Sequence, residues 1–475
     1  MDDTASKSNK WLGLAVFVYG SLAAAAFVFL VYHRQALVEA TVDLNGFGDI
    51  ARNIRDGNGF STTYGPTVRR GPFYPMLGAA LLWAFGERGQ NIPEAILYRP
   101  MIVANCVIFG LTCAVVYSIT KKIFGDVRIA LVAAAICPLI PQSLRYVGMT
   151  EVETLMALNI ALLAATGLTL VERPNATTGA TFGLVSALAT LTKPIVLLYP
   201  FLFLPLAFWY SGKKGAGRRQ RVIASVAAIA CFGALLLPWS LRNAFLTNGE
   251  FYGISSNAAG EFLRGYINAQ PKYYLLQQDF GGTDPRTEKW DPEANTYEER
   301  LLGAHGVPFY WAARDGAGKP VILPPPPPGV TPAMIEVEKD RIESAEMKRK
   351  LIQEPFGFLK KFAVQLFTFW YIVETRAKSL LIGSIAAVVL AFSIAGYVRA
   401  SRRNALVWPI IAVLVYFNLI YAAFLAFARY SMPLYPTLAM LAGGGVAALF
   451  EQLQPFLRRV VNTTRQDSPI QGRFY

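Results

Sequence analysis

Apolar stretches constrain this chain more than any other feature of its sequence. Runs of about 20 residues, the length that crosses a bilayer as a helix, recur along all 475 residues. Only 16% of the residues are charged and 54% are hydrophobic, whereas ordinary soluble domains carry roughly 25% charged residues. Because lipid offers no partner for backbone polar groups, such runs have to be helical. The sequence therefore predicts an all-α polytopic membrane protein.

Basic residues indicate the orientation of the runs. Lys7 and Lys10 precede the first run, residues 11–32, which places the N-terminus in the cytoplasm and Asp43 on the outer face. No small-residue cleavage pattern follows this run, so we expect it to be a membrane anchor. The formal charge of +14 is then explained by cytoplasmic loops such as 211–221, rather than by nucleic-acid binding.

Ten spans are expected if the chain alternates sides in step with its basic loops: 11–32, 98–120, 129–141, 154–171, 177–191, 195–210, 222–238, 379–398, 405–427 and 433–450. Two further apolar segments, 73–85 and 356–373, are predicted to lie on the outer surface as interfacial helices. If both crossed the membrane there would be twelve spans, and Lys121 and Lys122 would lie outside.

Polar composition divides the chain into four parts. We expect an N-terminal transmembrane module at 1–243 that contains a first outer loop at 33–97. An extracytoplasmic loop domain follows at 244–357, then C-terminal helices at 358–450 and a cytoplasmic tail at 451–475. Within the loop domain, five prolines at 324–328 predict a polyproline II stretch, and the Glu- and Lys-rich segment 333–353 predicts a helix.

Charged residues lie at the predicted outer ends of several spans. Asp43 follows the first span, and the pair Arg69–Arg70 ends the polar stretch after it. Arginine suits phosphate because its planar fork donates two parallel hydrogen bonds. An acid and a basic pair at a membrane edge are typical of a site for an anionic, lipid-borne substrate.

The order of these motifs resembles the GT-C superfamily of membrane glycosyltransferases, and within it glycosyltransferase family 39, which includes protein O-mannosyltransferases and lipid A aminoarabinose transferases. The acidic motif after the first span is matched at Asp43, Phe47, Ala51, Ile54, Gly57, Gly59 and Phe60. Later motifs match at 70–75 (R-G-P-F-Y-P), 150–151 (T-E), 191–194 (L-T-K-P), 238–243 (P-W-S-L-R-N) and 429–433 (R-Y-S-M-P). Phe47, Val152 and Lys193 stand where the family usually has Tyr, Pro and Arg.

This resemblance implies a GT-C fold with about 10–12 transmembrane helices, and an inverting transfer of a sugar from a polyprenyl-phosphate donor to a glycan, lipid or protein acceptor. It implies catalytic roles for Asp43, as general base, and Glu151. It implies donor phosphate binding by Arg69, Arg70, Lys193, Arg242 and Arg429. It implies a substrate pocket that includes Phe47, Tyr74, Glu153, Asn243 and Tyr430.

Neither a metal nor another cofactor is expected, because no D-x-D motif occurs in the outer loops near this site and the chain has only two histidines. We expect a protein of the bacterial inner (plasma) membrane, with its site on the periplasmic side and no nucleic-acid partner. The four cysteines fall within apolar runs, which predicts small buried side chains.

Simpler interpretations exist for the same residues. Asp43 could be solvated surface, and Arg69 and Arg70 could anchor lipid headgroups. Arg242 could cap a helix that ends near Ser240. Glu151 and Glu153 could be acids of a first helical turn, favoured by the helix dipole.

Two other function classes are open. A polysaccharide polymerase or ligase of another membrane class would also use outer arginines and lipid-linked glycans, but it would lack the acidic motif after the first span. A lipid-linked-sugar transporter or flippase would often show two related halves or charges within its spans. The sequence has no internal repeat, and charges within the expected spans are scarce.

Overall fold

The computed structural model describes residues 3–32, 43, 45–87, 92, 94–279, 292–307 and 330–466. Its long helices are α1 (Asp3–Phe27), which continues as the π-helical η1 (Val28–Tyr32), α6 (Arg99–Phe124), α9 (Glu153–Glu172), α11 (Tyr199–Lys213), α12 (Arg218–Leu246), α18 (Arg376–Arg402) and α21 (Tyr435–Gln466). Shorter apolar helices are α4 (Phe73–Phe85), α7 (Val127–Leu139), α10 (Ala176–Thr192) and α19 (Trp408–Ala423).

Polar and connecting segments form the remaining elements. The helical ones are α3 (Phe47–Arg55), α5 (Glu94–Leu97), α8 (Pro141–Leu144), η2 (Pro194–Val196), α13 (Ala258–Asn268), α14 (Pro271–Tyr274), α15 (Pro292–Ala304), α16 (Pro332–Gln353), α17 (Pro355–Thr368), α20 (Ala428–Ser431) and η3 (Met432–Leu434). The strand pairing in the described part of the chain is one antiparallel pair of two-residue strands, β1 (Ser61–Thr62) and β2 (Gly65–Pro66).

Within the described part of the chain, seven helical segments are long and apolar enough to cross a membrane. Each coincides with one of the ten expected spans. The other three expected spans are the shorter helices α7, α10 and α19, and the expected surface segment 73–85 is α4. The prediction of an all-α polytopic membrane protein is therefore confirmed, as are the helices predicted at 73–85 and 333–353.

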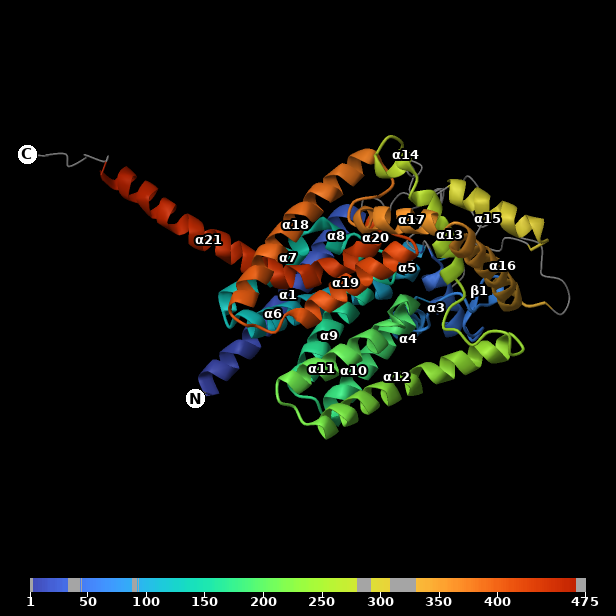
Figure 1. Cartoon of the computed structure of the whole chain (residues 1–475), viewed down its shortest axis with the longest axis horizontal. Coiled ribbons are helices and arrows are strands. Elements are labelled where there is room, and N and C mark those ends of the chain that lie inside the picture. Colours follow the sequence, from blue (N-terminus) through green and yellow to red (C-terminus); the bar gives the residue numbers. More distant parts are fainter. Residues whose placement is uncertain are drawn as a thin grey trace, which may run out of the picture.

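Segments predicted to share a side of the membrane meet at the same end of the bundle. Figure 1 shows the start of α1 and the far part of α21 at one end, and α3, α13 and α16 at the other. At the first end, Lys122 Nζ lies 2.5 Å from Glu172 Oε2, and Arg399 Nη2 lies 2.7 Å from Glu451 Oε1. Both pairs join helix ends that the basic-loop count puts in the cytoplasm.

A buried aromatic stack ties α10 and α11 to α19. Phe203 stacks on Phe182 with ring centres 4.9 Å apart, and on Trp408 with centres 5.1 Å apart. Tyr199 packs edge-on against Tyr416 at 5.2 Å. These contacts fix α10, α11 and α19 relative to one another, and the C-terminal ends of α10 and α19 carry residues of the site described below.

Helix α12 continues through Pro238 to Leu246, whereas the sequence predicted a span that ends at 238. Proline within a membrane helix removes one backbone hydrogen bond, which neighbouring groups can compensate. Arg242 therefore lies inside a helix, and the interpretation of Arg242 as a helix cap is wrong. The predicted burial of the cysteines is confirmed for Cys106, Cys113 and Cys137, whereas Cys231 is partly exposed.

A buried ion cluster holds the helices of the large loop together. Glu298 on α15 accepts from Arg264 Nη2 on α13 at 2.6 Å, and it also pairs with Lys339 on α16. These two cations hold the pKa of Glu298 well below its usual range, against the effect of its burial. The predicted polyproline run at 324–328 and the end of the predicted tail lie outside the described residues.

Candidate active site

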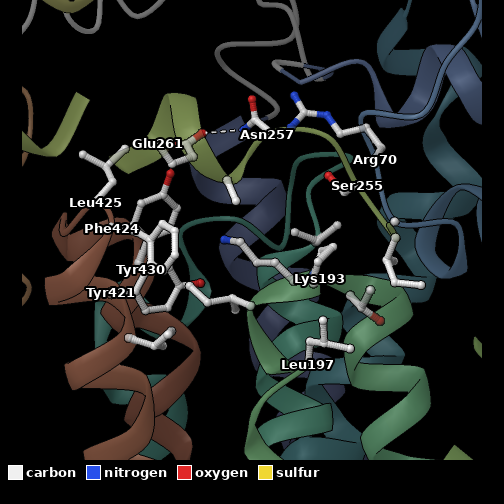
Figure 2. Close-up of a pocket in the computed structure, with 18 of the residues that line it drawn as sticks. Arg70, Lys193, Leu197, Ser255, Asn257, Glu261, Tyr421, Phe424, Leu425 and Tyr430 are labelled. Atoms are coloured by element: carbon white, nitrogen blue, oxygen red, sulfur yellow. Dashed lines mark hydrogen bonds between the residues drawn. The ribbon is translucent and has the colours of Figure 1, made fainter. Parts of the chain in front are cut away.

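A cavity of about 550 Å³ opens at the end of the bundle where the predicted outer segments meet. Its walls come from the first outer loop, the start of α9, the segment between α10 and α11, the region of α13, and the segment from α19 to α20 (Figure 2). Its lining includes five basic and two acidic side chains: Arg69, Arg70, Lys193, Arg264, Arg429, Glu153 and Glu261. This excess of positive charge suits an anionic ligand.

The backbone of the first loop brings Arg70 to the cavity. A side chain at Gly71 would place its Cβ 2.3 Å from the carbonyl oxygen of Leu191, so only glycine allows this close approach to the end of α10. The Arg70 guanidinium donates to the Asn45 carbonyl oxygen from Nη2 at 3.1 Å, and it lies 5.1 Å from the centre of the Phe47 ring. Burial lowers the pKa of Arg70, although nearby acids oppose the shift.

Two charged residues hold the loop that carries Arg69 and Arg70. From α16, Glu336 accepts hydrogen bonds from Thr67 Oγ1 at 2.7 Å and from Val68 N at 2.7 Å. From α12, Arg242 donates to the carbonyl oxygens of Thr67 at 2.7 Å and Phe60 at 2.9 Å. Predicted as a phosphate ligand, Arg242 does not line the cavity in this structure and instead positions the loop.

Arg69 is buried on the same loop. Its backbone carbonyl oxygen accepts a hydrogen bond from Ser255 Oγ, which joins the loop to the segment before α13. Burial and the neighbouring Arg70 lower the pKa of Arg69 to about 9. Arg69 is among the residues that line the cavity, and phosphate binding by its side chain stays a prediction.

Arg429 on α20 bridges two carboxylates from the start of α9. Its Nη2 donates to Glu151 Oε2 at 2.7 Å, and its Nε donates to Glu153 Oε1 at 2.7 Å. Its guanidinium also lies 4.9 Å from the centre of the Tyr146 ring. Glu153 and Arg429 line the cavity, whereas Glu151 is fully buried behind them.

Lys193, which directly follows α10, points into the cavity beside two stacked tyrosines (Figure 2). Tyr421 and Tyr430 are nearly parallel, with ring centres 4.7 Å apart, and Lys193 Nζ lies 4.2 Å from the centre of the Tyr430 ring. Glu153 Oε1 lies 3.9 Å from the same ammonium. Burial lowers the pKa of Lys193 to about 8, although Glu153 opposes the shift.

Asp43 is buried just behind the cavity wall. Its carboxylate accepts hydrogen bonds from Gly48 N at 2.9 Å, Asp49 N at 2.7 Å and Thr150 Oγ1 at 2.8 Å. It thereby satisfies the free N–H groups at the start of α3, which begins after the left-handed Gly46. Burial raises the pKa of Asp43, and its three hydrogen bonds oppose the shift.

Glu151 lies between the loop near Asp43 and the guanidinium of Arg429. Its Oε1 accepts from Asn45 Nδ2 at 2.8 Å, and its other oxygen accepts from Arg429. Burial raises the pKa of Glu151 to about 7, although Arg429 opposes the shift. The two predicted catalytic acids thus lie in one hydrogen-bonded layer beneath the cavity, and neither lines it.

The predicted pocket residues divide into two groups. Phe47, Glu153 and Tyr430 line the cavity. Tyr74 instead shares hydrogen bonds with Asn105 in the helix packing beneath, with a donor–acceptor distance of 3.2 Å. Asn243 donates to the Gly253 carbonyl oxygen at 2.8 Å and thus shapes the segment that leads to α13.

Sequence reasoning missed other residues of the cavity, including three from the large loop and one tyrosine. Asn257, Glu261 and Arg264 come from α13 and the residue before it, and Tyr421 comes from the end of α19. None of them lies in one of the quoted motifs. Glu261 and Arg264 are three positions apart, which puts them on one face of a helix, and that spacing is the only signal that the sequence offers for them.

One side of the cavity is apolar. Leu197 and Leu198, before α11, and Ile420, Phe424 and Leu425, in and after α19, line it there. The side chains of Leu197 and Leu198 are 38% and 51% exposed. Exposed leucines between two apolar helices are suited to contact with lipid.

No family profile matches the chain, and no curated protein matches it. Among solved structures, the chain is similar to the archaeal oligosaccharyltransferase AglB from Archaeoglobus fulgidus, solved with an inhibitory peptide and a dolichol-phosphate. The TM-score is 0.54 at 16% identity, over 98% of this chain and 53% of that one, so this chain spans about half of AglB's length.

ArnT from Cupriavidus metallidurans, solved with undecaprenyl phosphate and in the apo state, aligns over 93% and 94% of this chain and over 79% and 80% of its own length. Both alignments have a TM-score of 0.36 and 13% identity. The likeness to AglB and the helical architecture show the predicted GT-C fold. Membership of family 39 stays a prediction.

Proposed function

We propose that the protein transfers a sugar from a polyprenyl-phosphate donor to an acceptor at the extracytoplasmic face of the membrane. The observation that carries this proposal is the convergence of Arg70, Lys193 and Arg429 in one cavity. Phosphate needs such cationic donors, and an apolar wall beside them suits a lipid chain. AglB, whose fold is similar, was solved with dolichol-phosphate bound.

In this proposal the leaving group is the lipid phosphate. It departs as an anion, so it needs cations rather than a general acid. Arg70 and Lys193 have side chains that face the cavity, and Arg429 adds its charge at the wall. The acceptor attacks the anomeric carbon from the opposite side, which inverts its configuration.

Asp43 stays our candidate for the general base. Its raised pKa gives the carboxylate a greater affinity for a proton. Because Asp43 does not line the cavity here, proton transfer to it requires the segment around Asn45 to open toward the bound acceptor. Glu151 accepts hydrogen bonds from Asn45 and Arg429 and would hold that segment in its position beside the cavity.

The localisation that goes with this function is a bacterial inner membrane, with the cavity on the periplasmic side. No metal is required in the proposal. Among the described residues, no group of three or more His, Cys, Asp or Glu side chains could hold an ion. Turnover that persists in excess EDTA would agree with the metal-independent mechanism, and turnover restored only by a divalent ion would contradict it.

A binding measurement tests the proposal. Purified protein in detergent is titrated with undecaprenyl phosphate, and Arg70→Gln is compared with wild type. Loss of one charged hydrogen-bond donor to phosphate should weaken binding about 10- to 100-fold. Arg376→Gln serves as the control, because the Arg376 side chain is 55% exposed and lies outside the cavity. Equal affinities for all three proteins would contradict the phosphate site.

A further inference from the structure

Glu261 is an acidic residue of the cavity that the proposed reaction does not use. Its Oε1 accepts a hydrogen bond from Asn257 Nδ2 at 2.7 Å. Its Oε2 is buried and has no hydrogen-bond partner among the described residues. An unpaired buried carboxylate oxygen is unfavourable. Turning the Glu261 side chain so that this oxygen meets a hydrogen-bond donor of a ligand in the cavity would therefore be favourable.

Figure 2 shows what surrounds this carboxylate. Glu261 and Asn257 lie on the α13 side of the cavity, the hydroxyl end of Tyr430 points toward Glu261, and Lys193 reaches in from the opposite wall. The carboxylate, the amide and the phenol therefore form a polar region set apart from the apolar wall. A hydroxyl-rich ligand would find both acceptors and donors in it.

Charge determines which part of a lipid-linked sugar can bind beside the Glu261 carboxylate. A phosphate would be repelled by the Glu261 carboxylate and attracted to Arg70, Lys193 and Arg429. The sugar ring next to the phosphate carries neutral hydroxyl groups and, in some sugars, a cationic amino group. Both kinds of group donate hydrogen bonds. A carboxylate can accept from two neighbouring hydroxyls at once.

We propose that Glu261, Asn257 and Tyr430 form a subsite that binds the hydroxyl groups of the sugar carried by the lipid phosphate. This inference rests on the proposed function and deepens it. It makes Glu261 a determinant of which sugar is accepted, while the basic residues bind the phosphate whatever sugar is attached. The helix α13, from the large loop, thus contributes selectivity to a site built mainly by the membrane helices.

The test compares two affinities in each protein. One is for undecaprenyl phosphate alone, and the other is for the tightest of a panel of undecaprenyl phosphates that carry mannose, glucose, galactose or arabinose. Wild type should bind the best sugar-lipid about tenfold more tightly than the bare lipid. In Glu261→Gln this ratio should fall close to one, because a charged acceptor is replaced by a weaker neutral one. Affinity for the bare lipid should be unchanged or higher.

Control variants make the test specific. Glu250→Gln removes an exposed acid outside the cavity and should keep the wild-type ratio. Asn257→Ala leaves the carboxylate but removes its hydrogen-bond donor, and it should lower the ratio by a smaller factor. If Glu261→Gln does not fold, Glu261→Asp is measured instead and should also lower the ratio.

Four results would overturn the inference. A wild-type ratio near one, or a ratio unchanged in a folded Glu261→Gln, would remove the sugar subsite while leaving phosphate binding intact. An unchanged ratio with a higher KM for the acceptor in that variant would instead assign Glu261 to the acceptor. Failure of the bare lipid to bind wild type would contradict the proposed function itself, together with the inference that rests on it.

Discussion

Arg429 Nη2 lies 2.7 Å from Glu151 Oε2, although 278 positions separate the two residues in the sequence. This contact joins α20, near the C-terminus, to the segment before α9. With the second bond, from Arg429 Nε to Glu153, it pairs one cation with two carboxylates that are almost completely buried. The charged layer beneath the cavity depends on this one guanidinium.

Replacing Arg429 should therefore destabilise the fold as well as abolish activity. In Arg429→Met, Glu151 and Glu153 stay buried without this cation, and the free energy of unfolding should fall by about 3–5 kcal/mol. Thermal unfolding in detergent measures the change. Arg399→Met is the matched control, because its partner Glu451 is 65% exposed and their contact contributes little. Similar losses of unfolding free energy in both variants would contradict this structural role of Arg429.

Asp43→Asn should lower turnover about 100-fold or more, because the proton acceptor is lost. Binding of undecaprenyl phosphate should stay unchanged, because no phosphate contact is removed. Thr150→Val, which removes one hydrogen bond to the carboxylate, should have a smaller effect. Asp56→Asn, at an exposed aspartate, is the control for removal of charge from this loop. Wild-type turnover in a folded Asp43→Asn protein would rule out Asp43 as the base.

Lys193 should make donor capture depend on pH. Its pKa of about 8 means that the ammonium form is lost above that pH, so kcat/KM for the donor should fall as the pH rises through about 8. In Lys193→Arg the cation persists, and this fall should disappear. A wild-type profile that is flat from pH 7 to about 9 would contradict a phosphate-binding role for Lys193.

The lowered pKa of Lys193 also makes the stability of the fold depend on pH. The folded-state pKa of Lys193 lies below its ordinary value of 10.5, so the unfolded chain binds more protons between about pH 8 and 10.5. The contribution of Lys193 to stability should thus increase as the pH rises through that window. Lys193→Met should remove this increase, as followed by thermal unfolding at several pH values.

Glu336 should affect donor binding through the loop that carries Arg69 and Arg70. Glu336→Gln weakens three hydrogen bonds to Thr67 and Val68, which should let Arg69 and Arg70 move. We expect a KM for the donor about tenfold higher with little change in kcat, because the reacting groups are unaltered. Glu338→Gln, at a partly exposed glutamate on the same helix, is the control. Equal KM values in both variants would exclude a positioning role.

The helices could be predicted from the sequence because apolar runs of spanning length have few alternatives in lipid. The basic loops predict the sidedness, and the helix ends that they group together do meet in space. The end of α12 differs from the prediction, because the membrane helix continues through Pro238 to Leu246.

Short motifs identified most of the charged residues but not their geometry. Arg70, Lys193 and Arg429 were expected at one site, and all three line one cavity. Arg242, as a phosphate ligand, and Asp43, as general base, were expected at the same site, yet both are turned toward the backbone of the first loop. Glu261 could not be found, because it enters the cavity only through the tertiary packing of α13.

The central claim is tested most directly by turnover of lipid-linked sugars. Purified wild-type protein is given a panel of sugar-bearing polyprenyl phosphates with glycan, lipid and protein acceptors, and release of free polyprenyl phosphate is measured. We predict release with at least one donor, reduced at least about tenfold in Arg70→Gln and unchanged in Arg376→Gln. Binding of the donors without release from any of them, or release that is the same in Arg70→Gln, would contradict the proposed transfer at this cavity.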